Sequence, residues 1–160
     1  MPEPMWRKIV NELQVPEAGQ QWKLALNYVT PGKLMKVEVV VNTARNPPVT
    51  GTWTPQGFAT ACTADGDFNV TAQGPASPAG TRLVASAPLG ALIARIGGST
   101  ADQTLDTSAT PARVVFSIGR SCVFTVPASP TGSLYLGAND DPTRMAAVNG
   151  TLLVNIFEAI

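Results

Sequence analysis

The sequence predicts an all-β fold, a jelly-roll-like β-sandwich of about eight or nine short strands in a single domain that spans residues 1–160. Two observations predict this class. Apolar residues recur mainly with a period of two, and the breaks between apolar runs are rich in Gly, Pro, Asn, Asp and Ser. Short alternating strands separated by such turn residues are typical of sandwiches and barrels. A chain of 160 residues is also long enough to bury its own core.

The first half of the chain contains three strand candidates. Residues 6–13 are ambiguous, because Ile9, Val10 and Leu13 fit a helical stripe as well as an edge strand, and we favour the strand. Residues 22–29 form the second candidate. The third, residues 34–41, places alternate residues on opposite faces, with Met35, Val37, Val39 and Val41 on one side and Lys36 and Glu38 on the other.

The second half contains five further strand candidates that are rich in β-branched and aromatic residues. They are residues 90–96, 112–118, 121–126, 133–136 and 151–157. The first of these runs is apolar except for Arg95. Two long loops, residues 42–69 and 98–111, separate the strands, and long loops in a compact domain usually act in function or pack against a partner.

The charge of the chain limits the classes of partner. Only 14% of the residues are charged, against about 25% in ordinary domains. Lys and Arg number 11, Asp and Glu number 11, and the net charge is zero. Nucleic-acid binding needs a positive field, so we expect no nucleic-acid partner. Copies of a chain with little charge also repel one another only weakly. We therefore expect a homo-oligomer or a larger assembly.

The chain contains no histidine, which removes His-based acid–base catalysis, Ser-His and Cys-His pairs and His-ligated zinc. The Ser and Thr residues have no evident base partner. We therefore expect a protein that is not an enzyme and has no catalytic residues. Cys62 and Cys122 could form a disulfide or could both be small buried apolar residues, and we favour free thiols.

The first ten residues, MPEPMWRKIV, lack the apolar run of a secretory signal peptide. We expect synthesis in the cytoplasm, and release by another route or association with a surface stays open. No stretch of the chain approaches the roughly 18 apolar residues of a membrane-spanning helix, so we expect no membrane span.

Neighbouring carboxylates occur twice, at Asp65 and Asp67 and at Asp140 and Asp141. In loops that contain Gly or Asn, such pairs serve either as turn residues or as calcium ligands, and we favour the turn. Both pairs are too close in sequence to flank a sugar bond easily from opposite sides, as a glycosidase requires.

Two aromatic residues, Trp53 and Tyr135, could stack on a sugar ring. The alternative is that both pack in or around the core, because aromatic side chains dominate cores by area. We favour the core for both, and Trp53 stays among the candidate ligand contacts.

Several motifs occur in a specific order along the chain. They are WRK at 6–8, EAGQ at 17–20, YVTPGKLMKVEVV at 28–40, GTWTPQG at 51–57, GALIARIG at 90–97, SLYLGANDDP at 133–142 and NGTLLVNI at 149–156. With these motifs, residues 6–156 resemble the PA-IL-type bacterial galactose-binding lectins, which are small calcium-dependent jelly-roll sandwiches. The last three motifs are the most specific when they occur together, and residues 58–89 are outside the resemblance.

The resemblance implies a sugar bridged to a calcium ion by the loop at 140–150. Asp140 matches the aspartate of the lectins, but Arg144 occupies a threonine position, and Ala147 and Val148 occupy two asparagine positions. The sugar-contacting histidine of the lectins has no counterpart. Calcium needs six to eight oxygen ligands, so we favour an absent calcium ion over a bound one, with Asp140 and Asp141 as the remaining metal candidates.

We therefore expect a non-catalytic carbohydrate-binding, lectin-like module, with a galactoside as the type of ligand that the resemblance implies. The candidate contacts are Trp53, Gln56, Asp140, Asp141, Arg144 and Asn149. The alternative is a structural protein, a subunit of a larger surface, phage or filament assembly that uses the same fold.

Overall fold

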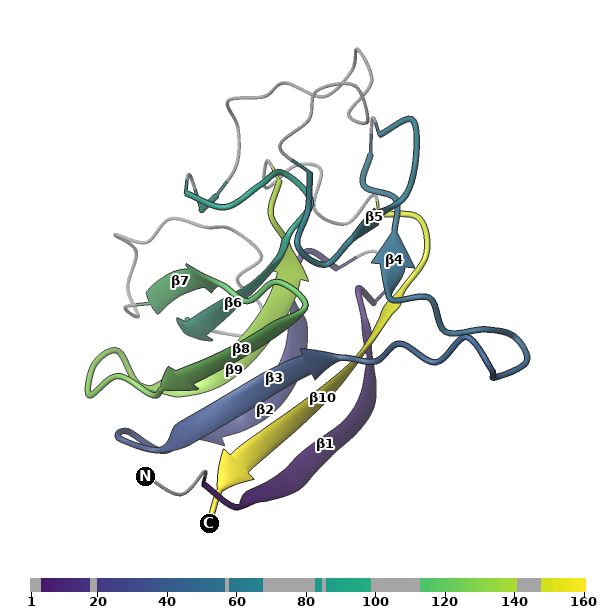
Figure 1. Ribbon diagram of the computed structural model, residues 1–160. Coiled ribbons are helices and arrows are strands. Elements are labelled where there is room, and N and C mark those ends of the chain that lie inside the picture. The colour runs from purple at the N-terminus through teal and green to yellow at the C-terminus, as the bar shows by residue number, and fades with distance from the viewer. Residues whose placement is uncertain are drawn as a thin grey trace.

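The computed structural model describes residues 4–17, 20–56, 58–67, 83–84, 86–98, 113–140 and 148–160. Two four-stranded antiparallel sheets lie one in front of the other and form a β-sandwich (Figure 1). The predicted fold class is therefore confirmed. These ranges contain strands and no helix, and hence no helix long and apolar enough to cross a membrane.

Each sheet mixes strands from distant parts of the chain. Sheet A has the order β1 (Trp6–Val15), β10 (Leu152–Ala159), β3 (Leu34–Val39) and β8 (Ser121–Thr125). Sheet B has the order β2 (Lys23–Val29), β9 (Gly132–Ala138), β6 (Leu92–Gly97) and β7 (Arg113–Ser117). Two short strands, β4 (Thr52–Trp53) and β5 (Cys62–Thr63), pair with each other at one end of the sandwich (Figure 1).

The ambiguous segment at residues 6–13 lies in a strand, as favoured. β1 pairs with β10, but its register shifts between Lys8 and Val10 and again between Val10 and Leu13. Each shift is a β-bulge or a similar irregularity, which adds residues to one strand and breaks the period of two. Val10 and Leu13 are therefore three residues apart and yet both pack against the core. The bulges account for the helix-like spacing in the sequence.

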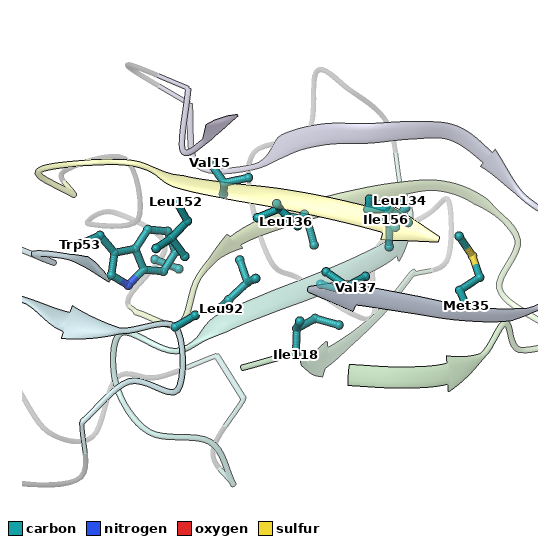
Figure 2. Close-up of a cluster of buried hydrophobic side chains, with 14 of the residues drawn as sticks. Val15, Met35, Val37, Trp53, Leu92, Ile118, Leu134, Leu136, Leu152 and Ile156 are labelled. Carbon is teal, nitrogen blue, oxygen red and sulfur yellow. The ribbon is translucent and has the colours of Figure 1, made fainter. Parts of the chain in front are cut away.

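The core lies between the two sheets, and the inner positions of the strands supply it. Val37 of β3 and Val154 and Ile156 of β10 are fully buried in sheet A. Leu92, Leu134 and Leu136 face them from sheet B and are also fully buried. Figure 2 shows this cluster, with Trp53 at one end and Met35 at the other. Alternation along the strands predicts these inward positions.

Two details differ from the sequence prediction. The described ranges already contain ten strands, against the eight or nine expected, because β4 and β5 lie inside the predicted loop at 42–69. A two-residue strand is too short to show periodicity. Val41 was predicted to share a face with Met35 and Val37, which are buried, but it is 60% exposed. β3 ends at Val39, so the alternation does not extend to Val41.

Both cysteines are free thiols, and Cys62 is buried. This agrees with the favoured alternative. The second predicted loop, residues 98–111, falls outside the described residues apart from Gly98.

Candidate functional site

Four distant segments meet at the end of the sandwich where β4 and β5 lie (Figure 1). Thr54, just after β4, exchanges two backbone hydrogen bonds with Asn149, at 2.7 and 2.8 Å. Gly90, just before β6, donates its N–H to the carbonyl of Asn139, just after β9, at 2.8 Å. Leu92 donates to the carbonyl of Ala64 at 2.8 Å. Backbone bonds therefore hold the motifs of the resemblance together at one end of the fold.

Trp53 is an interior residue in this structure. Its ring is only 1% exposed and points into the core beside Leu152 (Figure 2). The indole Nε1 donates a hydrogen bond to the carbonyl of Gly90 at 2.8 Å, which satisfies the one polar atom of the ring. Trp53 thus packs in the core at this end of the sandwich, and neither face of its ring is exposed for a sugar to stack on. Its assignment as a stacking contact is replaced by a packing role.

Gly90 allows this close packing. Its φ is +80°, and a Cβ at this position would come within 2.9 Å of Pro55 and 3.2 Å of the Cys62 sulfur. Burial, and then the negative charge of Asp67, raise the pKa of the Cys62 thiol to about 12. A thiol with so high a pKa stays protonated near neutral pH and is a poor nucleophile.

Asn139 is the most highly connected polar side chain at this end. It is fully buried. Its Oδ1 accepts hydrogen bonds from the N–H groups of Leu83 and Val84, both at 2.9 Å. Its Nδ2 donates to the carbonyls of Val84, Ala87 and Pro88 at 3.0, 3.2 and 3.0 Å. Asn139 thereby holds residues 83–84 and 87–88 against the end of β9.

The remaining candidate contacts differ in accessibility. Asp140 follows Asn139 and is only 1% exposed. Gln56 and Asn149 are exposed and lie on the two segments that the Thr54–Asn149 bridge joins. Asp141 and Arg144 lie outside the described residues. The bridge therefore brings the segments that carry Gln56 and Asn149 next to each other.

Of the calcium loop implied by the resemblance, residues 140–150, the structure describes Asp140 and residues 148–150. Val148, at one of the asparagine positions, is half-buried and packs against the hydrophobic core, so its side chain supplies no oxygen. No group of three or more His, Cys, Asp or Glu side chains within the described ranges is arranged to hold a metal. Asp140 and Asn149 alone fall short of the six to eight oxygens that calcium takes. Asp141, Arg144 and Ala147 of the loop lie outside the described residues, so the expected absence of calcium stays a prediction.

The other carboxylate pair is partly engaged in a turn. Asp65 lies between β5 and the bridge at Asp67, and its N–H donates to Thr63 Oγ1 at 3.3 Å. Its carboxylate accepts hydrogen bonds from the N–H and the Nε of Arg120, at 2.9 and 2.6 Å. This ion pair ties the end of the β4–β5 hairpin to the turn between β7 and β8.

Sequence reasoning missed the importance of Asn139 and Arg95. Asn139 was only part of an Asn-Asp step, and nothing in a single sequence shows that its amide closes five hydrogen bonds. Arg95 was an interruption in an apolar run, yet it is fully buried in β6. Its guanidinium lies over the rings of Trp22 and Tyr135, at 5.1 and 4.1 Å from their centroids. No local pattern marks a cation that is buried through cross-strand contacts.

No family model matches this chain, and no curated protein is significantly similar to it. The arrangement at the β4–β5 end must therefore be interpreted from its own chemistry. It offers exposed amide groups on a rigid backbone frame, a buried carboxylate and a protonated thiol. Amides both donate and accept hydrogen bonds, so this surface is suited to binding a polyhydroxylated molecule.

Proposed function

We propose that this chain is a non-catalytic, lectin-like module that binds a glycan at the β4–β5 end without calcium. The observation that supports the proposal is the backbone bridge between Thr54 and Asn149. This bridge holds the exposed residues Gln56 and Asn149 on adjoining segments. The resemblance to the galactose-binding lectins makes a galactoside the first ligand to test.

The expected mode of binding is shallow. The described residues enclose no pocket, and the aromatic ring of this end is buried. Hydrogen bonds from amide side chains would supply the contacts with sugar hydroxyls, each worth about 1 kcal/mol net. Such a site is expected to be weak in one copy of the chain, and multivalent presentation would strengthen it.

A glycan array, probed once with calcium and once with a chelator, tests the proposal. We expect galactoside binding that is the same in both buffers, and an approximately fivefold loss of affinity in Asn149→Ala, from one lost hydrogen bond. The backbone bonds of Asn149 survive this substitution. Asn27→Ala is the matched control, because Asn27 is an exposed asparagine on β2, toward the opposite end of the sandwich from β4.

Binding that disappears in chelator would contradict the calcium-free mode and would assign a metal site to residues that include Asp140. Absence of binding in both buffers would contradict the glycan proposal as a whole. Equal losses in Asn149→Ala and Asn27→Ala would place the glycan elsewhere on the molecule.

A second candidate function is that of a structural subunit in a surface, phage or filament assembly. The observation in its favour is an uncharged edge strand, β8, with the sequence SCVFT, on a chain with only 14% charged residues. An edge strand of this kind is a template for pairing with another chain. An extended polymer in solution, together with an empty glycan array, would favour this candidate over the lectin-like one.

A further inference from the structure

The two edges of sheet A differ in how they are protected. The edge strand β1 carries Arg7 and Lys8, two register shifts, and a positive φ of 51° at Glu12. Charges and bulges of this kind prevent pairing between edges. The other edge strand, β8, contains no charged residue and no proline, and its pairing with β3 has no register shift. β8 is therefore the unprotected edge.

Hydrogen bonds at the two ends of the β3–β8 pair establish which groups of β8 point outward. The N–H of Val126 donates to Lys33 at 2.8 Å, and the carbonyl of Arg120 accepts from Val39 at 2.9 Å. In an antiparallel pair, every second residue bonds to the partner strand. The even-numbered residues of β8 thus bond to β3, and the N–H and C=O groups of Ser121, Val123 and Thr125 point away from the sheet.

These outward residues are accessible. Ser121 and Thr125 are exposed, and Val123 is 53% exposed. Apart from a weak contact between the Cys122 sulfur and the Val123 carbonyl at 3.8 Å, the outward groups make no hydrogen bond within the described part of the chain. Unpaired strand groups are satisfied either by water or by another strand.

We propose that β8 pairs antiparallel with β8 of a second copy of this chain, about a two-fold axis at Val123. In that register Val123 bonds to Val123 of the other copy, and Ser121 and Thr125 bond to each other across the axis. All outward donors of both strands then meet a carbonyl. The product is one continuous eight-stranded sheet built from two copies of sheet A.

The charges of the edge favour a second copy over an unrelated partner. Self-pairing about a two-fold axis opposes each strand to an identical one, so a charge near the axis would meet its own sign. β8 has no charge, and Arg120 at its end already has Asp65 as an ion-pair partner at 2.6 Å. β1, in contrast, carries the charged residues Arg7, Lys8 and Glu12.

The adjoining side chains can extend the contact. Phe124 of β8 and Phe116 of β7 are both half-buried and touch edge to face, with ring centroids 4.9 Å apart. They lie where the two sheets come together beside this edge, so a paired copy would cover additional apolar area. In an isologous contact both copies bury the same edge, so no such edge is left to bind a third copy. The proposed pairing therefore predicts a closed dimer instead of a filament. The inference goes beyond glycan binding and does not depend on it.

Light scattering coupled to size exclusion, over a range of concentrations, tests the proposal. We expect a mass about twice the 16.7 kDa of one chain for the natural protein. Val123→Pro removes an outward N–H and leaves the bonds to β3 intact, because proline is tolerated at the exposed side of an edge strand. We expect at least about tenfold weaker dimerisation, since the bond is lost twice by symmetry. Val123→Thr keeps the N–H and should remain dimeric.

Two further measurements decide the result if Val123→Pro fails to fold. Val123→Lys keeps the N–H but places like charges at the axis, so it should be monomeric at low salt and regain the dimer at high salt. Amide hydrogen exchange on the natural protein should show protection of Ser121, Val123 and Thr125 that rises with concentration.

A natural protein that stays monomeric at all concentrations would overturn the proposal. So would a dimer that survives both Val123→Pro and Val123→Lys, or amide protection that is independent of concentration. Loss of the dimer in Val123→Thr as well would show an interface made by side chains, which also contradicts backbone pairing. None of these results bears on the glycan array.

Discussion

The outer faces of the two sheets carry the same chemical pair in opposite surroundings. On sheet A, Lys36 of β3 lies opposite Phe157 of β10, with its Nζ 4.6 Å from that ring and 5.0 Å from the ring of Trp6. On sheet B, Arg95 of β6 lies opposite Tyr135 of β9, between the rings of Tyr135 and Trp22. The Lys36 side chain is 20% exposed, whereas Arg95 is fully buried.

This difference shows that the stabilisation from a cation–aromatic contact depends on how much water reaches the pair. An exposed pair is worth about 0.5–1 kcal/mol, and a desolvated pair about 2 kcal/mol or more. Lys36 also has Glu38 as an ion-pair partner at 3.2 Å and keeps contact with water. The Arg95 cluster is covered by Leu83 and Val84, which pack against Trp22, Ile93 and Tyr135. Substitutions that release Leu83 and Val84, or that change the cation itself, therefore test this comparison.

The largest loss of stability is expected from Asn139→Ala, because Asn139 holds Leu83 and Val84 over the outer face of sheet B. The substitution removes five hydrogen bonds and deprives the N–H groups of Leu83 and Val84 of their acceptor. We expect a loss of about 3 kcal/mol or more in the free energy of unfolding, measured by urea denaturation. Asn139→Asp keeps the acceptor and loses the donors, so its effect should be intermediate. Denaturation of Asn139→Ala within about 1 kcal/mol of the natural protein would contradict the role of Asn139.

Replacing the two cations by methionine compares the two faces. Arg95→Met should cost about 2 kcal/mol, because it deletes a desolvated cation between two rings. Lys36→Met, the matched variant on sheet A, should cost less than about 1 kcal/mol.

Urea denaturation measures both losses. Added salt should reduce the loss of unfolding free energy in Lys36→Met and leave the loss in Arg95→Met unchanged. Equal losses in the two variants would mean that burial does not distinguish the pairs. Arg95→Lys adds a further check, since it keeps the charge but loses the planar guanidinium that stacks on aromatic rings.

The smallest effect is expected from Tyr135→Phe. The Tyr135 hydroxyl is buried and finds no hydrogen-bond partner among the described residues, so its removal sacrifices no bond that the structure shows and relieves a desolvation cost. The free energy of unfolding should stay within about 0.5 kcal/mol or rise slightly. The ring that faces Arg95 is preserved, which makes this variant a control for the Arg95 series. A loss above about 1 kcal/mol would reveal an essential partner of the hydroxyl.

Much of the fold was predictable because the strand signal is local. Alternation placed Met35 and Val37 of β3 on one face, and both are buried in sheet A. The failures have local causes as well. Bulges distort the spacing in β1, and the β4 and β5 strands consist of two residues each, which is below the length at which a period can appear.

The candidate site was predicted less well, because a binding surface depends on exposure and exposure is not local. Gln56 and Asn149 are exposed and lie on segments that the Thr54–Asn149 bridge joins, but their part in binding stays a prediction. Tryptophan is a residue type that often stacks on sugars, but the Trp53 ring points inward and its Nε1 donates to the Gly90 carbonyl. The glycan function and the oligomer stay predictions until the array and the mass measurement are made.

The sequence by itself determined the class of fold, the two-residue period that places the core, and the absence of histidine chemistry. These properties follow from residue types and from spacing over a few positions. Only the tertiary structure decided that Arg95 is buried while Lys36 meets water, that Asn139 fixes a distant segment, and that β8 is left open at an edge. Each of these depends on contacts between residues far apart in the chain, and long-range pairing is what a local pattern does not encode.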